Sequence, residues 1–222
     1  MLNGMPSIFR PHDLLWICRS ALKKPELDAG SIPAWVSRGK GPVVVRRAET
    51  QPGLVPVGIR GSKREERFAA LAPEQAVEKS VSPFALRAAK LWLQHPERDH
   101  HPVLRTLGSV ACILNEEELD WGITGSLGYE LATGDPQLRP GSDLDLVIER
   151  PTPMSRHQAE KLMTKLTGHL CRIDVQVETP EGAIGLSEWA RPSGKVLIKT
   201  SMGPRLTESP WSAPHEGGGT HC

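Results

Sequence analysis

The chain has 222 residues, enough for one large domain or two small ones with a substantial buried core. Its formal net charge is only +1, so overall charge gives no indication of nucleic-acid binding. No stretch approaches the roughly 18 apolar residues that a membrane helix requires, and the N-terminal region has no long apolar run of the signal-peptide type.

The cysteines are Cys18, Cys112, Cys171 and Cys222, and no two of them have the C-x-x-C spacing of a metal or redox pair. Nothing else in the sequence indicates a disulfide framework. We therefore expect reduced thiols and a cytoplasmic location, with neither nucleic acid nor membrane among the partners.

Residues 1–80 are rich in proline and glycine and carry short β-branched runs. The runs at 42–46 and 54–60 are bounded by Gly or Pro and predict strands, with a turn at 49–53 between them. The charged stretch 62–71 predicts a short helix. The first region is therefore expected to be a small α+β domain.

Residues 81–207 predict a second domain, in which strands alternate with helices. Ser82 and Pro83 form a good helix start, because Ser accepts a backbone hydrogen bond and Pro lacks an N–H that would go unpaired there. Helices are expected at 82–95, 102–114, 127–132 and 155–169, and strands at 120–124, 143–149, 172–178 and 194–201. The remaining residues, 208–222, are expected to be a disordered tail.

The segment SDLDL contains two carboxylates, Asp143 and Asp145, that share one face of a strand because residues two apart point the same way. Leu144 and Leu146 then face the core. Two carboxylates on one face repel each other unless a cation lies between them, and magnesium is commonly held by one or two carboxylates plus substrate phosphates. A D-x-D pattern alone does not require a metal site, because it also occurs by chance in a solvated strand with two surface acids.

Gly125 and Ser126 follow an apolar strand and begin a helix. Backbone N–H groups at a helix start favour bound phosphate, and Gly permits close approach. Asp174 lies on the polar face of a later strand, where it would join Asp143 and Asp145 if the two strands were neighbours. Three converging carboxylates opposite a Gly-Ser turn predict magnesium- or manganese-dependent phosphoryl transfer, with Asp174 as a metal ligand and proton acceptor.

Gly-Ser on a helix, Asp-x-Asp on a strand and a third Asp together resemble the polymerase-β-like nucleotidyltransferase superfamily, whose fold is a mixed α/β unit. One departure is the long segment between Ser126 and Asp143. The loop 133–141 is therefore expected to bulge outwards, towards substrate.

A closer resemblance is to the malonate decarboxylase holo-acyl-carrier-protein synthase family, also called phosphoribosyl-dephospho-CoA transferase. WGITGSLGYELATG and SDLDLVIE carry it, supported by RPHDLLW, PVGIRG and WARP elsewhere in the chain. The resemblance extends to about residue 207.

The resemblance implies transfer of the 2′-(5″-phosphoribosyl)-3′-dephospho-CoA group from triphosphoribosyl-dephospho-CoA to a serine of the apo acyl-carrier subunit of malonate decarboxylase, with loss of diphosphate. It makes Asp143 and Asp145 the metal-binding catalytic acids, and Gly125 and Ser126 the triphosphate-binding turn. The expected fold is a small N-terminal α/β domain followed by a nucleotidyltransferase-like mixed-sheet domain with flanking helices.

Several cations have an open role. Lys195 and Lys199 could contact phosphate or simply be solvated. The basic residues of the first region could bind the phosphates of the substrate, bind an acidic carrier, or form a solvated face. These residues are Arg46, Arg47, Arg60, Lys63, Arg64 and Arg67. The histidines in HPERDHHP match no zinc spacing, so a loop between two helices is expected there.

Two other functions remain open. The scaffold could use ATP or another nucleoside triphosphate on a protein or small-molecule acceptor. It could also be a non-catalytic module that binds a carrier protein, although a binder would not need three aspartates.

Overall fold

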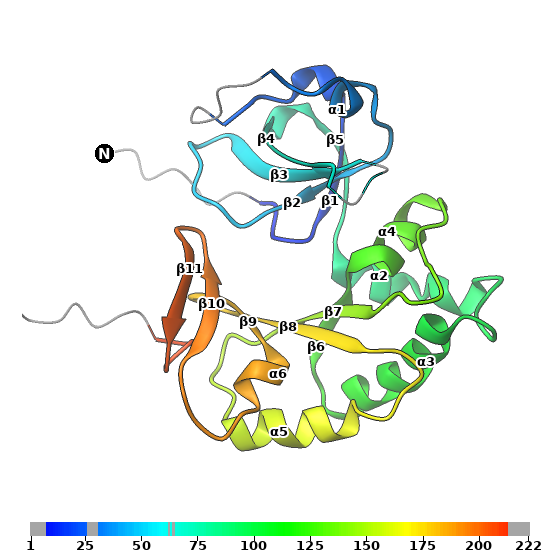
Figure 1. Cartoon of the computed structure of the whole chain (residues 1–222), viewed down its shortest axis with the longest axis vertical. Coiled ribbons are helices and arrows are strands. Elements are labelled where there is room, and N and C mark those ends of the chain that lie inside the picture. Colours follow the sequence, from blue (N-terminus) through cyan, green and yellow to red (C-terminus); the bar gives the residue numbers. More distant parts are fainter. Residues whose placement is uncertain (1–7, 26–30, 62, 64, 213–222) are drawn as a thin grey trace, which may run out of the picture.

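The structure, a computed structural model, describes residues 8–25, 31–61, 63 and 65–212, and it contains two β-sheets with helices around them (Figure 1). Strands up to residue 81 build the first sheet and strands from residue 120 to 207 build the second. The chain is therefore a mixed α+β protein, as the sequence predicts. Cys222 and residues 213–222 of the predicted tail lie outside the described residues.

The N-terminal sheet is antiparallel throughout, with the strand order β4-β3-β2-β1-β5. Its strands are β1 (Leu14–Ile17), β2 (Val43–Val45), β3 (Leu54–Arg60), β4 (Arg67–Pro73) and β5 (Val77–Val81). The short helices η1 (Arg19–Ala21), α1 (Ala34–Arg38) and η2 (Glu74–Ala76) connect them. Val43 and Val45 are buried with Val55 and Val57, so the β-branched runs form the core of this sheet, as predicted.

The predicted helix at 62–71 is wrong. Residues 67–73 instead form β4, which pairs with β3 along its whole length, from Arg60↔Arg67 to Leu54↔Pro73. The alanines favour a helix locally, but pairing with β3 buries Ala70 and Ala72 completely. Tertiary burial therefore overrides intrinsic helix propensity here. Residues 62 and 64 of the predicted helix lie outside the described residues.

The C-terminal sheet has the strand order β11-β10-β9-β8-β7-β6, in which β7 and β8 are parallel and the other neighbours are antiparallel. Its strands are β6 (Asp120–Ile123), β7 (Leu144–Glu149), β8 (Ile173–Thr179), β9 (Gly182–Gly185), β10 (Val196–Thr200) and β11 (Gly203–Thr207). The parallel pair requires a crossover connection, and helix α5 (Arg156–Lys165) supplies it.

The remaining helices are α2 (Pro83–Ala89), η3 (Leu91–Gln94), α3 (Pro102–Glu116), α4 (Gly125–Thr133) and α6 (Leu186–Trp189). Ser82 caps α2 by accepting a hydrogen bond from the Ala85 N–H, as predicted. The predicted helix 82–95 is interrupted, however, because Lys90 adopts a left-handed conformation with φ 51°. Helix α5 also stops earlier than predicted, and Leu170 is 56% exposed beyond its end.

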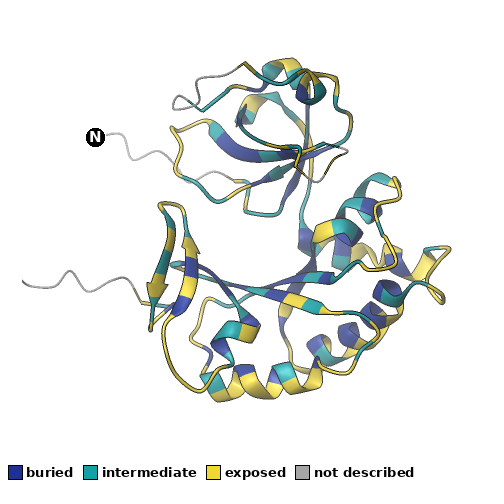
Figure 2. Cartoon of the chain, in the orientation of Figure 1, coloured by how far each residue is buried: buried dark blue, intermediate teal, exposed yellow. Residues whose placement is uncertain are grey.

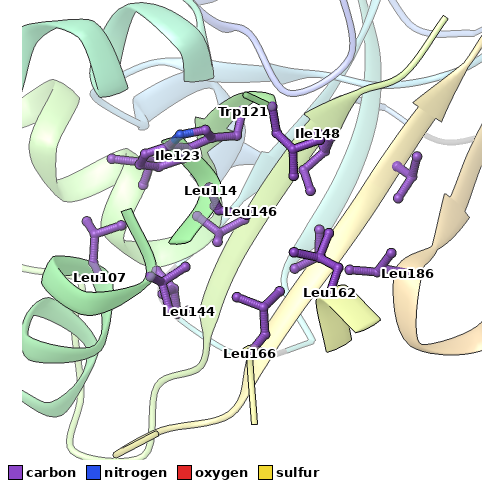
Figure 3. Packing of buried hydrophobic residues seen from close by; sticks show 14 of the residues in the cluster. Leu107, Leu114, Trp121, Ile123, Leu144, Leu146, Ile148, Leu162, Leu166 and Leu186 are labelled. Carbon is purple, nitrogen blue, oxygen red and sulfur yellow. The ribbon is translucent and has the colours of Figure 1, made fainter. Parts of the chain in front are cut away.

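The core of the C-terminal domain lies on one face of its sheet, which α3, α5 and α6 cover (Figures 1 and 2). Leu144, Leu146 and Ile148 point from β7 into this core, beside Leu114 and Leu162 (Figure 3). The alternation predicted for this strand is therefore confirmed. It leaves Asp145 on the opposite side, which faces the N-terminal domain. Among the described residues, no helix is long and apolar enough to cross a membrane.

Polar contacts join the two domains across that face. Gln176 on β8 lies 2.6 Å from His12 through the nitrogens of both side chains, and it also donates to Glu178 at 2.8 Å. Arg47 of the N-terminal domain donates to Glu178 at 2.5 Å. Arg10 forms a further ion pair with Glu149 at 2.8 Å. The N-terminal domain is thus held against the polar face of the C-terminal sheet.

Candidate active site

Strand pairing brings the second and third aspartates side by side. In the parallel pair β7–β8, Asp145 lies directly opposite Asp174, and Leu144 opposite Ile173. Residues opposite each other in a sheet have side chains on the same face. Asp143 comes immediately before β7, and it is close enough to Asp145 for its charge to raise the pKa of that carboxyl. The predicted neighbourhood of Asp174 and the D-x-D pair therefore exists in the fold.

The electrostatics of Asp145 reflect this grouping. Burial, together with the nearby carboxylates of Asp174 and Asp143, raises its pKa to about 6. The cationic side chains of Arg60 and Arg172 oppose it only in part. A carboxylate that shares its surroundings with two others is costly to ionise. The negative charge gathered here is what a bound cation would neutralise.

A hard divalent cation fits this donor set, since magnesium and manganese prefer oxygen ligands and leave positions for substrate phosphates. Within the described residues, no group of three or more His, Cys, Asp and Glu side chains is already drawn together at metal-binding spacing. Metal binding by Asp143, Asp145 and Asp174 therefore stays a prediction. Its support is the raised pKa and the strand register.

Gly125 forms the turn from β6 into α4, directly beside Asp145. Its φ is +63°, a left-handed conformation that favours Gly. A Cβ at this position would overlap Oδ2 of Asp145. The neighbouring Thr124 N–H donates to the Asp145 carbonyl oxygen at 3.0 Å, which fixes the turn against β7. Gly125 and Ser126 thus place the N-terminal end of α4 next to the acids, as the phosphate-binding prediction requires.

A cleft of about 800 Å³ lies between the two domains, in front of this turn. The C-terminal domain contributes Gly125, Ser126, Tyr129 and Asp145 to its lining. Cations of the N-terminal domain line the opposite wall. They are Arg19, Lys40, Arg46, Arg60 and Arg67. Its volume is in the range of sites for small molecules and cofactors.

The basic residues predicted as a patch in the first region have different surroundings in the structure. Arg46, Arg60 and Arg67 face the cleft, whereas Arg47 is used in the ion pair with Glu178. Lys63 is exposed and does not line the cleft. Arg64 lies outside the described residues.

The two predicted phosphate-binding lysines do not line the cleft. Lys199 is on β10 and donates to the side-chain oxygen of Gln176 at 3.3 Å, within the interdomain contact. Lys195 is exposed just before β10. Neither is brought into contact with Asp145, so their phosphate-binding role stays a prediction without geometric support.

The long segment between Ser126 and Asp143 consists of the rest of α4, which ends at Thr133, and an anchored loop. Glu130 is 8% exposed, and its Oε2 accepts the N–H groups of Gln137 at 2.6 Å and Leu138 at 2.7 Å. His95 lies 2.9 Å from the other carboxylate oxygen. Burial alone would raise the pKa of Glu130, but these donors outweigh it and hold the pKa below its usual value. Gln137 from this loop lines the cleft, so the anchor shapes the site.

The histidines of HPERDHHP serve this loop. His95 Nδ1 accepts from the Glu97 N–H, so its Nε2 carries the proton donated to Glu130. His101 accepts from the Val103 N–H, which caps α3, and its other ring nitrogen reaches the Arg139 carbonyl oxygen at 3.2 Å. The predicted position between two helices is confirmed, and the contacts are structural.

Replacing Glu130 with Gln is expected to destabilise the protein by about 1–3 kcal/mol, because the new NH2 group would face either His95 or the two backbone N–H groups, and the neutral oxygen is a weaker acceptor than a carboxylate. The backbone amides of Gln137 and Leu138 should exchange hydrogen faster. Exchange followed by mass spectrometry checks this. The exposed Glu117, paired with Lys165 at the surface, provides the control: Glu117→Gln should cost less than about 1 kcal/mol. Unchanged exchange at both amides in Glu130→Gln would show that the carboxylate does not anchor the loop.

The sequence assigned no role in the site to three residues, although His12 and Tyr129 lie within the motifs that carry the family resemblance. Arg19 lines the cleft, and its Nη1 is buried without a hydrogen-bond partner among the described residues. Tyr129 lies one helical turn after Gly125 and meets the N-terminal domain at Gly41, where an added Cβ would overlap its hydroxyl. His12 joins the interdomain contact, and burial lowers its pKa despite the nearby Glu178. These roles depend on how the domains face each other.

Two family models match the chain. The model of the phosphoribosyl-dephospho-CoA transferase MdcG N-terminal domain matches residues 10–83, and that of the MdcG C-terminal domain matches residues 90–210. The chain belongs to this family. Each model covers one of the two sheets and its helices, and the second contains the three aspartates and the Gly-Ser turn.

Curated relatives agree along nearly the whole chain. A phosphoribosyl-dephospho-CoA transferase of Pseudomonas putida (strain GB-1) is 45% identical over 92% of this chain and 96% of its own length. One from Klebsiella pneumoniae is 41% identical over 91% of this chain and 96% of its own length. One from Azotobacter vinelandii (strain DJ / ATCC BAA-1303) is 38% identical over 91% of this chain and 94% of its own length. No solved structure matches. The family resemblance inferred from the sequence motifs is confirmed.

Proposed function

We propose that this chain is a phosphoribosyl-dephospho-CoA transferase that acts on the acyl-carrier subunit of malonate decarboxylase. Family membership across both domains supports the activity. The observation that carries it is the register of Asp145 with Asp174 beside the Gly125 turn, at the wall of a cleft large enough for a nucleotide-like substrate. The donor of the transferred group is triphosphoribosyl-dephospho-CoA.

The reaction is an in-line displacement at the α-phosphorus of the donor. The carrier serine oxygen forms a bond to this phosphorus, the bond from phosphorus to the bridging oxygen of the diphosphate breaks, and diphosphate leaves with the electron pair. Asp174 accepts the serine proton in this proposal, and its greater exposure than Asp145 supports that role. The turn at Gly125 and Ser126 positions the triphosphate through backbone N–H groups.

Asp143, Asp145 and Asp174 would hold magnesium or manganese. Bound there, such an ion would supply positive charge to the phosphate oxygens. The succession β6, Gly-Ser turn, α4 and β7, with β8 beside β7, supports assignment of the C-terminal domain to the polymerase-β-like nucleotidyltransferases. The pinned loop 133–141 is then an insertion that lies at the cleft.

The test is the intact mass of the carrier subunit after incubation with this protein, magnesium and triphosphoribosyl-dephospho-CoA. The expected result is a mass increase equal to the phosphoribosyl-dephospho-CoA group, together with release of diphosphate. Diphosphate release with ATP in place of the donor would instead favour a nucleotidyltransferase of different substrate. Carrier binding without any mass change would favour a non-catalytic binding module.

A further inference from the structure

The N-terminal domain presents two arginines side by side at the cleft. Arg60 ends β3 and Arg67 begins β4, and the two are directly paired across these strands. Directly opposite residues have side chains on one face, and like charges in this arrangement repel each other. Both line the cleft. The fold therefore keeps an unfavourable pair of positive charges at the wall facing the acids.

Neither guanidinium is neutralised by an ion pair within the described part of the chain. No salt bridge or side-chain hydrogen bond joins Arg60 or Arg67 to another described residue, whereas Arg47 and Arg10 of the same domain are paired with Glu178 and Glu149. Asp145 is the one acid among the described residues lining the cleft. The cleft therefore has an excess of positive charge, and its natural occupant is a polyanion.

Arg60 and Arg67 line the same cleft as Asp145 and the Gly-Ser turn. Arg60 is close enough to Asp145 for its charge to oppose the effects of burial and the neighbouring acids on the pKa of that carboxyl. Gly125 and Ser126, which begin α4, line the same cleft. A triphosphate in the cleft would meet backbone N–H groups on one side and two guanidinium groups on the other. Guanidinium groups suit phosphate because they donate two parallel hydrogen bonds.

We propose that Arg60 and Arg67 bind the β- and γ-phosphates of the nucleotide substrate, so that the N-terminal domain supplies half of the active site. This inference rests on the proposed function for the identity of the substrate. The two arginines hold the triphosphate before transfer and neutralise the charge that collects on the diphosphate as the bond to the α-phosphorus breaks. They are separate from the aspartates, which act at the α-phosphorus.

Calorimetric titration with inorganic tripolyphosphate in the presence of magnesium tests the proposal without the carrier. The wild-type protein should bind, and Arg60→Gln and Arg67→Gln should each weaken binding about tenfold or more, the usual loss for a charge-assisted hydrogen bond. Arg60→Lys, which keeps the charge but not the two parallel donors, should be intermediate. Arg38→Gln is the matched control, because Arg38 lies on α1 of the same domain and does not line the cleft. It should bind like the wild type.

Thermal melting should show all four variants folded, because each replaces an exposed side chain and the two changes to Gln at Arg60 and Arg67 also remove one of two repelling charges. Wild-type-like tripolyphosphate binding by Arg60→Gln would overturn the proposal. Loss of carrier binding with normal tripolyphosphate binding in Arg60→Gln or Arg67→Gln would also overturn it, because the arginines would then be a docking surface for the carrier.

The proposal and the proposed function fail separately. Wild-type binding of tripolyphosphate that is lost in Arg60→Gln, with no modification of the carrier by any form, would retain the phosphate site and reject the function. Unchanged transfer kinetics and unchanged tripolyphosphate binding in Arg60→Gln would retain the function and reject the phosphate site.

Discussion

Replacing Asp145 with Asn is expected to lower transfer of the prosthetic group by more than about a hundredfold, because we propose that Asp145 holds the metal ion and loss of such an acid costs several kcal/mol of transition-state stabilisation. The same change should make the metal-free protein more stable. An amide of nearly the same shape removes a charge that burial disfavours and that Asp174 and Asp143 repel. Loss of activity with a gain in stability distinguishes a functional acid from a structural one.

The direction of the stability change follows from how tightly the folded and unfolded forms bind the Asp145 proton. The pKa of Asp145 is about 6 in the folded protein against 3.8 for the ordinary group, so the folded form binds the proton more tightly than the unfolded form. Stability therefore falls as the pH rises from about 4 to about 6, and the full cost is present above that window. The difference corresponds to about 3 kcal/mol, which screening by solvent at this half-buried side chain reduces to about 1–2 kcal/mol.

Thermal melting in EDTA at pH 8 and at pH 3.5 measures this effect. Asp145→Asn should melt higher than the wild type at pH 8, and the difference should shrink to near zero at pH 3.5, where the carboxyl is protonated in the folded state and mostly protonated in the unfolded state. Magnesium should raise the melting temperature of the wild type more than that of the variant. Asp99→Asn, at an exposed aspartate paired with Arg98, is the control and should show neither effect. Normal carrier modification by Asp145→Asn would refute the assignment.

Replacing Gly125 with Ala is expected to reduce transfer almost as severely. An alanine Cβ would occupy the position of the Asp145 carboxylate, so either the turn or the acid must move. Displacement of about 1 Å in a catalytic group lowers rates by about a hundredfold. The left-handed backbone adds a cost of about 1–2 kcal/mol to folding.

Gly168→Ala separates these two effects. Gly168 also has a positive φ, +80°, but an added Cβ there meets no atom within 4 Å. Both variants should lose similar stability to the backbone conformation, whereas only Gly125→Ala should lose transfer activity and the stabilisation by magnesium. Melting temperatures and initial rates of carrier modification give the comparison. Equal activity in the two variants would mean that the contact between Gly125 and Asp145 is unimportant.

The sequence by itself determined the elements whose pattern is local. The alternation in SDLDLVIE indicated a strand with leucines buried and aspartates on the other face, and the structure has this arrangement. Ser82 and Pro83 marked the start of α2. The motifs around Gly125 and Asp143 were specific enough to indicate the family, which the comparisons confirm. Each of these features depends on side-chain period, capping or short spacing.

Only the tertiary structure decided what depends on partners distant in the chain. Residues 67–73 became a strand because β3 pairs with them, against their local preference. Asp174 reached Asp145 through the parallel pairing of β7 and β8, which the sequence could suggest but not fix. The loop 133–141 is held by the carboxylate of Glu130, which accepts two of its backbone N–H groups. Arg60 lies in the same cleft as Asp145 because the two domains face each other. Long-range pairing and domain contact leave no periodic trace in a single sequence, because the residues involved are separated by many others.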